Sequence, residues 1–365
     1  MISRLGQDGR IRRFPRTLAN IILTTTPTIY GGQQMATVGE VGERALIDLM
    51  LRHITPMPGM PVPFWDDVMA VSLGAGRAAV LNTDMLVWET DVPPGMTPFQ
   101  AARKAVVMNF SDLGAKGVRP QAFIASLAIP RETPVSVVEE MARGFEAGAR
   151  EHGGYVIGGD TNEAAEIIIS GVAIGVAKED ALMKREGAEP GDVLATTGLF
   201  GDTASAFKIL LKGYEAPEEL REALVESVYN PTTRVEEGVA LAGTGSVSAS
   251  IDSSDGLAIS LHDLTRSSSV GFRLESVPTS PNAREFAELH GLDPIDLALY
   301  GGEEYDLVFT VRPSGLEKAR EALRAVGGEL IVLGEATADK RIVYVEDGVE
   351  KPVGKGGWDH FTMGA

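Results

Sequence analysis

The chain has 365 residues, 44% of them hydrophobic and 23% charged, which predicts two globular domains and excludes a disordered or fibrous protein. Its 33 basic and 51 acidic residues leave a formal net charge of −18, so its surface repels nucleic acid and anionic lipid. The absence of cysteine excludes disulfides, thiolate metal sites and cysteine nucleophiles, and no apolar run reaches the ~18–20 residues that a membrane-spanning helix needs.

The first 34 residues differ in composition from the rest of the chain. They hold five arginines against a single acid, Asp8, and then become rich in Thr and Ile. Transit peptides are Arg- and Ser-rich and amphipathic, and this segment matches that pattern only in part. We interpret residues 1–34 as a leader or a mis-chosen start, with a short docked arm as the alternative. From Met35 the sequence becomes acidic, and residues 38–47 predict a helix.

After this extension, strand-like and helix-like segments alternate, which predicts an α/β protein. Residues 78–85 predict a strand. Thr97-Pro-Phe-Gln100 predicts a capping box with proline at the first helical position, opening a helix that stops near Gly117. The other elements expected in the first half are strands at 122–128, 155–157 and 167–176 and a helix at 135–150.

The alternation resumes after Gly187-Ala-Glu-Pro-Gly191, which predicts a linker. Ser314-Gly-Leu-Glu317 predicts a second capping box for a helix that runs to Ala325. We therefore expect an N-terminal domain over residues 35–180 and a C-terminal domain over residues 181–365. The further elements expected in the second half are strands at 193–197 and 247–251 and a helix at 203–211.

Aspartates gather near the ends of these apolar segments. Carboxylates crowded there repel one another unless cations bridge them. Oxygen-only ligands suit Mg²⁺, which binds phosphate groups at the same time. Five segments together therefore favour a metal–phosphate site: Trp65-Asp66-Asp67, Asn82-Thr83-Asp84, Asn109-Phe-Ser-Asp112, Gly158-Gly-Asp-Thr161 and Asp252-Ser-Ser-Asp-Gly256.

Taken singly, most of these acids have simpler explanations. Asp84 and Asp160 are typical of helix caps and turns. Asp66-Asp67 is typical of a solvated turn, and Asp252-Ser-Ser-Asp-Gly256 of an N-cap for the helix that follows. Asp112 is the exception, because it lies on the face of an otherwise apolar helix, where an acid without a partner is costly.

Glycine pairs, which predict turns, supply a second, weaker signal for phosphate binding. Gly158-Gly159 follows the strand expected at 155–157, and Gly301-Gly302 precedes a strand expected at 306–311. Glycines let backbone amides approach phosphate oxygens closely. The sequence contains no GxxxxGK[ST] segment, no protein-kinase signature, no HExxH pair and no GxSxG elbow, which excludes P-loop and protein-kinase chemistry and leaves Ser-His-Asp hydrolysis without an anchor.

Together these segments resemble thiamine-monophosphate kinase, a family in the superfamily of aminoimidazole ribonucleotide synthetase. The resemblance implies an α/β (α+β) two-domain fold, in which the N-terminal sheets of two subunits form a barrel across a homodimer and the C-terminal domain is an α/β sandwich. The segments that carry it, in family order, are Asp66-Asp67, Asn82–Val87, Asn109–Leu113, Ile157–Thr161, Lys184–Asp192, Thr197–Asp202, Ile251–Leu257, Tyr300–Tyr305 and Gly357-Trp-Asp-His-Phe361.

The resemblance also implies the ligands and their residues. ATP would phosphorylate thiamine phosphate to thiamine diphosphate by direct in-line transfer, with several magnesium ions, in a cytoplasmic homodimer without nucleic-acid or membrane partners. Family metal positions correspond to Asp67, Asn82, Thr83, Asp84, Asp112, Asp160, Asp252 and Asp255, of which Asp84, Asp112 and Asp252 are expected to be catalytic. Family ATP contacts correspond to Gly159, Asp160, Arg185 and Ser254, and family thiamine contacts to Glu303 and Trp358.

The sequence departs from the family pattern at three places. Asp91 stands where many members have a substrate-contacting histidine, so we expect Asp91 at the substrate and a contact with the acceptor that differs from the family's. Phe64-Trp65 replaces a more usual Ile-Gly, and Asn82 a Ser or Thr.

The chemistry implied by the resemblance agrees with the composition. A phosphate acceptor is already ionised near neutral pH, so alignment and charge neutralisation carry the reaction without a strong base. Three alternatives stay open: another ATP-dependent reaction on the same scaffold, such as that of aminoimidazole ribonucleotide synthetase; an inactive nucleotide-binding regulator; and a metal-dependent phosphohydrolase.

Overall fold

The structure, a computed structural model, describes residues 36–357. Residues 1–34, for which a leader or arm was expected, and Trp358 lie outside this range. The chain divides into two compact units, and the described part of the first covers residues 36–54. Its helices α1 (Val38–Val41) and α2 (Glu43–Leu51) confirm the helix expected over 38–47, with a break at Gly42, where φ is 76°.

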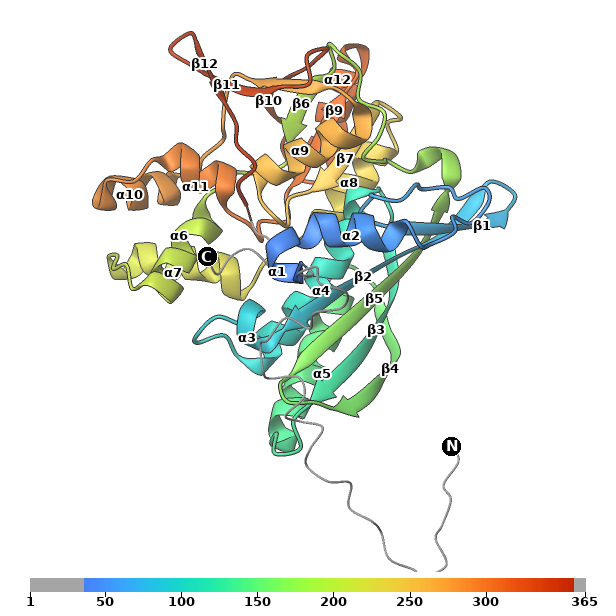
Figure 1. Cartoon of the computed structure of the whole chain (residues 1–365), viewed down its shortest axis with the longest axis vertical. Helices are drawn as coiled ribbons and strands as arrows, with labels where there is room; N and C mark the ends of the chain where they lie inside the picture. Colours follow the sequence, from blue (N-terminus) through green and yellow to red (C-terminus); the bar gives the residue numbers. More distant parts are fainter. Residues whose placement is uncertain (1–35, 358–365) are drawn as a thin grey trace, which may run out of the picture. The chain divides into compact units, whose positions relative to one another are not determined.

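The second unit begins with a five-stranded sheet in the order β1-β2-β5-β3-β4, in which β3 and β4 are parallel and the other neighbours antiparallel. Figure 1 shows the long strands side by side. Their bounds are β1 (Met69–Gly74), β2 (Arg77–Val87), β3 (Pro120–Ile129), β4 (Tyr155–Glu163) and β5 (Ile168–Lys178).

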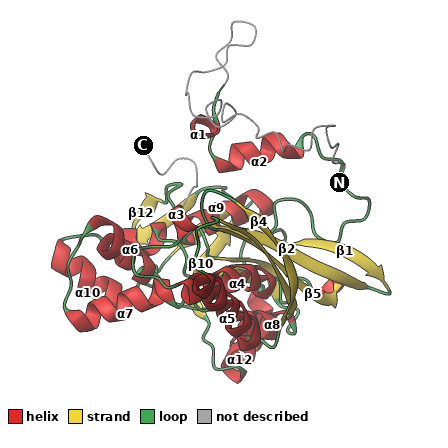
Figure 2. Ribbon diagram, turned by 90° about the horizontal axis from the view of Figure 1, so that it is seen from below, coloured by secondary structure: helices red, strands yellow, loops and turns green. Residues whose placement is uncertain are grey.

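Two long helices, α4 (Pro98–Ala115) and α5 (Val135–Glu151), pack on one side of this sheet (Figure 2). Phe110 and Leu113 of α4 share a buried core with Phe123 of the sheet. The predicted capping box at the start of α4 is confirmed, because the Thr97 side chain accepts the N–H of Gln100. The cap fixes where α4 begins, and the core packing fixes which face of α4 is buried, so together they set the positions of its polar residues.

A seven-stranded sheet forms the second half, in the order β12-β11-β8-β10-β6-β9-β7. Leu194, Val308 and Phe272 of this sheet join a separate buried core with Leu261 from a covering helix. The strands are β6 (Val193–Thr196), β7 (Val247–Asp252), β8 (Gly271–Leu274), β9 (Leu307–Val311), β10 (Ile331–Thr337), β11 (Ile342–Glu346) and β12 (Val349–Pro352).

Of the remaining helices, α3 (Trp88–Asp91) follows β2 of the first sheet, and the others lie between the strands of the second half (Figure 1). Two sheets, each with its own helices and core, confirm the expected two-part α/β architecture. The helices are α3 (Trp88–Asp91), α6 (Asp202–Lys212), α7 (Glu218–Tyr229), α8 (Val235–Ala242), α9 (Leu257–Ser268), α10 (Pro281–His290), α11 (Pro294–Tyr300) and α12 (Leu316–Ala325). No helix within residues 36–357 combines the length and apolarity that crossing a bilayer requires.

Two local predictions were wrong. The strand expected at 155–157 continues to Glu163, so Gly158-Gly159 lies inside β4 rather than in a turn. Pairing with β3 explains this, since a Cβ on Gly159 would lie 1.9 Å from the carbonyl oxygen of Ala125. Before α12 there is no side-chain cap; a 3₁₀ turn over Pro313–Gly315 leads into the helix instead, because proline fixes a φ suited to that turn.

Candidate active site

Three carboxylates from distant segments meet where the two halves of the second unit adjoin. Asp67 lies before β1, Asp112 in the last turn of α4, and Asp252 at the end of β7. One oxygen of each lies within 4.8 Å of the others. We call Asp66, Asp67, Asp84, Asp112 and Asp252 the acidic cluster. Such a group of oxygen ligands matches the preference of a hard divalent cation.

Strand β2 contributes Asn82 and Asp84 to this cluster. Nδ2 of Asn82 donates to Oδ2 of Asp112 at 2.8 Å and to Oδ2 of Asp84 at 3.3 Å. The N–H of Asp84 donates to Oδ1 of Asn109 on α4 at 3.3 Å. The Oδ1 of Asn82 is buried and accepts no hydrogen bond. Asn82 therefore orients two carboxylates and presents an unused oxygen beside them.

The carboxylate of Asp252 is tied to the helix that carries Asp112. Ser111 donates its Oγ–H to Oδ2 of Asp252 at 2.7 Å, and the Oγ of Ser254 lies 3.5 Å from Oδ1. Burial and then the charge of Asp67 raise the pKa of Asp252 to about 7, while the bond from Ser111 opposes them. Without cations, this carboxyl group is therefore partly protonated at neutral pH.

At Asp112, repulsion from neighbouring acids adds to the effect of burial. Burial raises its pKa well above the usual value, and repulsion from Asp84, Asp252 and Asp67 adds to this, while the hydrogen bond from Asn82 opposes it. A divalent cation nearby would favour the ionised carboxylate. The acid singled out from the sequence is thus one whose ionisation needs a positive charge nearby.

Two cations hold the other side of the cluster. Lys116, at the end of α4, places its Nζ 2.8 Å from Oδ1 of Asp66 and 2.5 Å from Oδ2 of Asp67. Arg185 donates from Nε to Oδ1 of Asp67 at 2.7 Å, and its Nη1 lies 3.6 Å from Asp263. Burial raises the pKa of Asp67, but Arg185 and Lys116 together bring it below its usual value.

Lys116 was missed from the sequence. Burial lowers its pKa, but Asp66 and Asp67 outweigh burial and raise it, so the ammonium stays charged. Its spacing was a usable signal, since it follows Asp112 by four residues and therefore lies on the same helical face. Its own partners precede it by about fifty positions, beyond the reach of local patterns.

Trp65 adopts the backbone conformation that glycine usually supplies. Its φ is 70°, in the left-handed region where a side chain costs energy. The guanidinium of Arg266 lies 3.6 Å from the centre of the Trp65 ring, a cation–π contact that offsets part of this cost. The turn that presents Asp66 and Asp67 is thus kept although tryptophan replaces the family's usual glycine.

The carboxylate of Asp91 is engaged within its own segment. Its Oδ2 accepts the N–H of Val87 at 2.7 Å, and its Oδ1 accepts the hydroxyl of Thr90 at 2.9 Å. The buried Nζ of Lys104 donates to the carbonyl oxygen of Asp91 at 2.9 Å and to Oε1 of Glu303 at 2.5 Å. Lys104 therefore connects two of the predicted substrate contacts, one from each half of the unit.

Other predicted residues lie apart from the acidic cluster. Thr83 donates its hydroxyl to the carbonyl oxygen of Gly171 at 2.8 Å. Gly159 and Asp160 are exposed on β4, which is separated from β2 by β5 and β3. Three strand spacings correspond to about 14 Å. Within one chain, β4 therefore does not bring Asp160 to the cluster.

Ser254 and Asp255 lie beside Glu303. The Ser254 carbonyl accepts the N–H of Glu303 at 2.6 Å. Glu303 and Tyr305 both have a positive φ, of 65° and 54°, a strained conformation that often marks a functional loop. The N-cap that Asp252-Ser-Ser-Asp-Gly256 suggested is not formed, because Gly256 precedes α9 without a side-chain cap.

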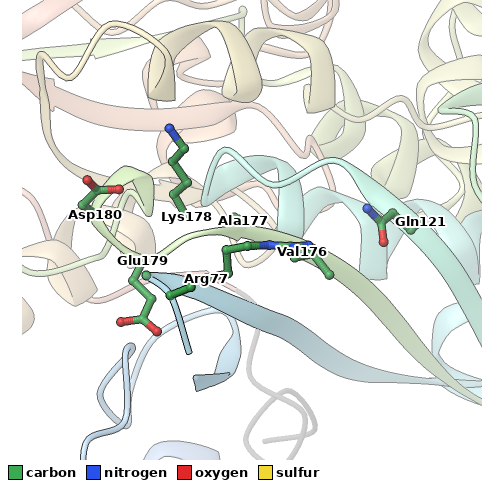
Figure 3. A pocket seen from close by; sticks show the side chains of 9 residues that line it. Arg77, Gln121, Val176, Ala177, Lys178, Glu179 and Asp180 are labelled. Carbon is green, nitrogen blue, oxygen red and sulfur yellow. The ribbon is translucent and has the colours of Figure 1, made fainter. Parts of the chain in front are cut away.

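A cavity of about 720 Å³ lies elsewhere, at the turn between β1 and β2 and the end of β5. Figure 3 shows the polar side chains that line it, which include Arg77, Gln121, Lys178, Glu179 and Asp180. It shares no residue with the acidic cluster. The converging carboxylates, rather than cavity size, therefore locate the candidate site.

Comparison with known proteins gives consistent matches across both halves. Residues 65–177 match the model of "AIR synthase related protein, N-terminal domain", and residues 189–346 match "AIR synthase related protein, C-terminal domain". The thiamine-monophosphate kinase of Pyrococcus horikoshii is 38% identical over 290 residues, which cover 78% of this chain and 87% of the relative. That of Nitrosopumilus maritimus is 34% identical over 282 residues, covering 77% and 89%.

A solved structure agrees with these relatives. AaThiL complexed with AMPPCP and TMP superposes with a TM-score of 0.79 at 27% identity, covering 90% of this chain and 100% of that one. The expected two-domain fold is thereby confirmed.

Proposed function

The chain belongs to the thiamine-monophosphate kinase family, and from this premise we propose that its acidic cluster aligns ATP with thiamine phosphate for direct phosphoryl transfer. The reaction is the ATP-dependent phosphorylation of thiamine phosphate to thiamine diphosphate. The observation that carries the proposal is the convergence of Asp67, Asp112 and Asp252 within 4.8 Å. Because the acceptor phosphate is already ionised, the site needs positive charge and alignment more than a base.

The donor set fits magnesium. It consists of oxygen atoms, and the buried Oδ1 of Asn82 is a further oxygen without a hydrogen bond. Asp84, Asp112 and Asp252, with Asn82 and Asp67 beside them, would hold the ions. Bound magnesium would neutralise the phosphate charges that otherwise repel each other. The raised pKa values of Asp112 and Asp252 support this assignment, since burial and neighbouring acids disfavour the ionised form of both carboxyl groups and a bound divalent ion would favour it.

The remaining residues hold the substrates. Arg185 and Ser254 correspond to ATP contacts, and each already contacts an acid of the cluster. Glu303 corresponds to a thiamine contact, and Lys104 fixes one of its oxygens. An anionic carboxylate suits the positively charged thiazolium ring of thiamine. The carboxylate of Asp91 is used within its own segment, so we propose that Asp91 shapes the acceptor site and leaves charge recognition to Glu303.

We further propose a cytoplasmic homodimer that brings β4 into the active site. β1, β2 and β4 expose Val71, Leu73, Met85, Tyr155 and Ile157 by 43–60%, an apolar surface that a second copy would cover. Such pairing would also give the exposed Asp160 and Gly159 a route to the acids of the partner, which one chain does not provide.

The test is direct incubation of the protein with ATP, magnesium and thiamine phosphate. We expect thiamine diphosphate and ADP in equal amounts, and neither without magnesium. ADP with free phosphate, but no thiamine diphosphate, would identify a phosphohydrolase. No turnover under any of these conditions would identify a nucleotide-binding regulator. Omitting thiamine phosphate is the matched control, because it separates ATP hydrolysis from transfer.

A further inference from the structure

We propose that Lys116 is a built-in cation of the acidic cluster, which takes the place of one divalent ion between Asp66 and Asp67. The inference rests on the proposed metal site and assigns to this lysine a charge that a bound ion would otherwise supply. Lys116 acts on the carboxylates and not on the substrates, so it is a positioning residue.

The surroundings of Lys116 are those of a cation site. Its Nζ lies 2.8 Å from Oδ1 of Asp66, 2.5 Å from Oδ2 of Asp67 and 2.5 Å from the carbonyl oxygen of Ser250. Two carboxylate oxygens and one carbonyl oxygen, converging on one point, are ligands that a hard divalent ion takes in proteins. The three partners come from the loop before β1 and from β7, so the ammonium ties the two halves together.

The contacts of the Lys116 ammonium leave no N–H group free to face a substrate phosphate. The Nζ of Lys116 donates a hydrogen bond to the carbonyl oxygen of Ser250 and forms close ion pairs with Oδ1 of Asp66 and Oδ2 of Asp67. The side chain has no exposed surface, and neither does that of Asp67. A lysine that binds a substrate phosphate needs a free donor facing the substrate. Lys116 therefore balances the charge of the carboxylates instead.

The rest of the cluster shows what the lysine replaces. Over residues 36–357, no lysine or arginine nitrogen lies within 4.0 Å of a carboxylate oxygen of Asp112 or Asp252. Ions brought by the reaction would have to serve that side. Asp66 and Asp67, by contrast, face Lys116 and Arg185. The chain therefore supplies positive charge beside Asp66 and Asp67, and bound ions would supply it beside Asp112 and Asp252.

Counting bound ions tests this assignment without measuring activity. Equilibrium dialysis with Mn²⁺ and saturating AMPPCP gives the number of ions per chain. We expect Lys116→Met to bind one Mn²⁺ more than the wild type, because the ion fills the position that the ammonium leaves. Lys104→Met is the matched control. It removes another fully buried lysine of α4, whose partner is Glu303, and its ion count should equal that of the wild type.

Thermal unfolding covers the case in which the lysine variant folds poorly. With EDTA, Lys116→Met should unfold at a lower temperature than the wild type, because Asp66 and Asp67 lose a buried partner. Mn²⁺ should restore more stability to Lys116→Met than to the wild type or to Lys104→Met.

Equal ion counts in the wild type and Lys116→Met, or a Lys116→Met chain that stays unfolded with Mn²⁺, would overturn the proposal. A wild type that binds no Mn²⁺ beyond that carried by AMPPCP would instead refute the metal site itself.

Discussion

Asp67 and Asp112 both belong to the acidic cluster, yet their pKa values move in opposite directions. Burial raises both. Beside Asp67, Arg185 and Lys116 outweigh burial and lower the pKa, whereas beside Asp112 other carboxylates, Asp84 foremost, raise it further. The sign of the neighbouring charge, and not the depth of burial, separates the two acids.

One helix produces much of this difference. α4 places Asp112 beside Asp84 and Asp252, whose charges repel its carboxylate. One turn later, Lys116 at the end of the helix contacts Asp66 and Asp67. The folded chain therefore neutralises the negative charge of Asp66 and Asp67 with its own cations and leaves the other side of the cluster negatively charged. A side left charged is suited to ions that arrive with the substrates.

The largest expected effect comes from removing a carboxylate on the side without a paired cation. Asp112→Asn and Asp252→Asn should each lower kcat by at least ~100-fold, because a lost metal contact removes several kcal/mol of transition-state stabilisation. Thiamine diphosphate formation measures this, and thermal unfolding confirms that both variants fold.

Asp66→Asn is the matched control from the paired side. It should lower kcat by less than about tenfold, since Lys116 still holds Asp67 and an exchange worth under ~1.4 kcal/mol changes a rate less than tenfold. Equal losses in Asp66→Asn and Asp112→Asn would break the comparison between the two sides.

A smaller effect is expected from pH. The pKa of Asp252 is raised to about 7, so its carboxyl group must lose a proton before it can bind an ion. In isothermal titration without nucleotide, Mn²⁺ affinity should rise by up to about tenfold per pH unit below pH 7 and level off above it. Asp252→Asn should weaken this dependence, and the part that remains should come from Asp112, whose pKa is also raised. A wild-type affinity that stays constant from pH 5.5 to 8 would contradict it.

Whereas Mn²⁺ affinity should rise with pH, the free energy of unfolding of the metal-free protein should fall as pH rises. A carboxyl group whose folded pKa is raised binds more protons in the folded state than in the unfolded state. Its contribution to stability is present below the unfolded pKa of about 4 and is lost as pH rises through about 7. Asp252→Asn should flatten this fall, as measured by urea unfolding in EDTA.

Local patterns in the sequence predicted α4 and its start, because Thr97 and Gln100 form their capping box within one turn. The cost of burying Asp112 was also visible from its helical face. Contacts between distant parts of the chain could not be predicted from these local patterns. Gly158-Gly159 was taken for a turn because its pairing with β3 is set by tertiary structure.

The same limit applies to the site. The role of Lys116 depends on acids about fifty positions away, and that of Asp91 on the turn that encloses its carboxylate. Motif order identified which acids to examine, but only the fold shows which of them already have a cation.

A variant of Glu303 tests whether an acid that is paired with a lysine still contributes to substrate binding. Like Asp67, it is paired with a buried lysine of α4, here Lys104, but it lies at the predicted thiamine contact. Glu303→Gln should raise the KM for thiamine phosphate by about tenfold and leave the KM for ATP unchanged, since a charged hydrogen bond contributes ~1.5–3 kcal/mol. Steady-state kinetics with each substrate varied in turn separates the two constants. A rise confined to ATP would place Glu303 on the nucleotide side.

The smallest effect is expected from a variant that weakens the start of α4, which tests whether kcat and the Mn²⁺ count depend on that end of the helix. Thr97 caps α4 at the end opposite to Asp112 and Lys116, and Thr97→Ala should reduce the free energy of unfolding by ~1 kcal/mol because one N–H loses its acceptor. The core that α4 shares with the first sheet holds its last turn in place, so kcat and the Mn²⁺ count should stay at wild-type values. Urea unfolding measures the first quantity, and the assays described above measure the others. A change in ion count with an unchanged unfolding free energy would mean that the start of α4, and not its packing, sets the positions of both the acid and the lysine.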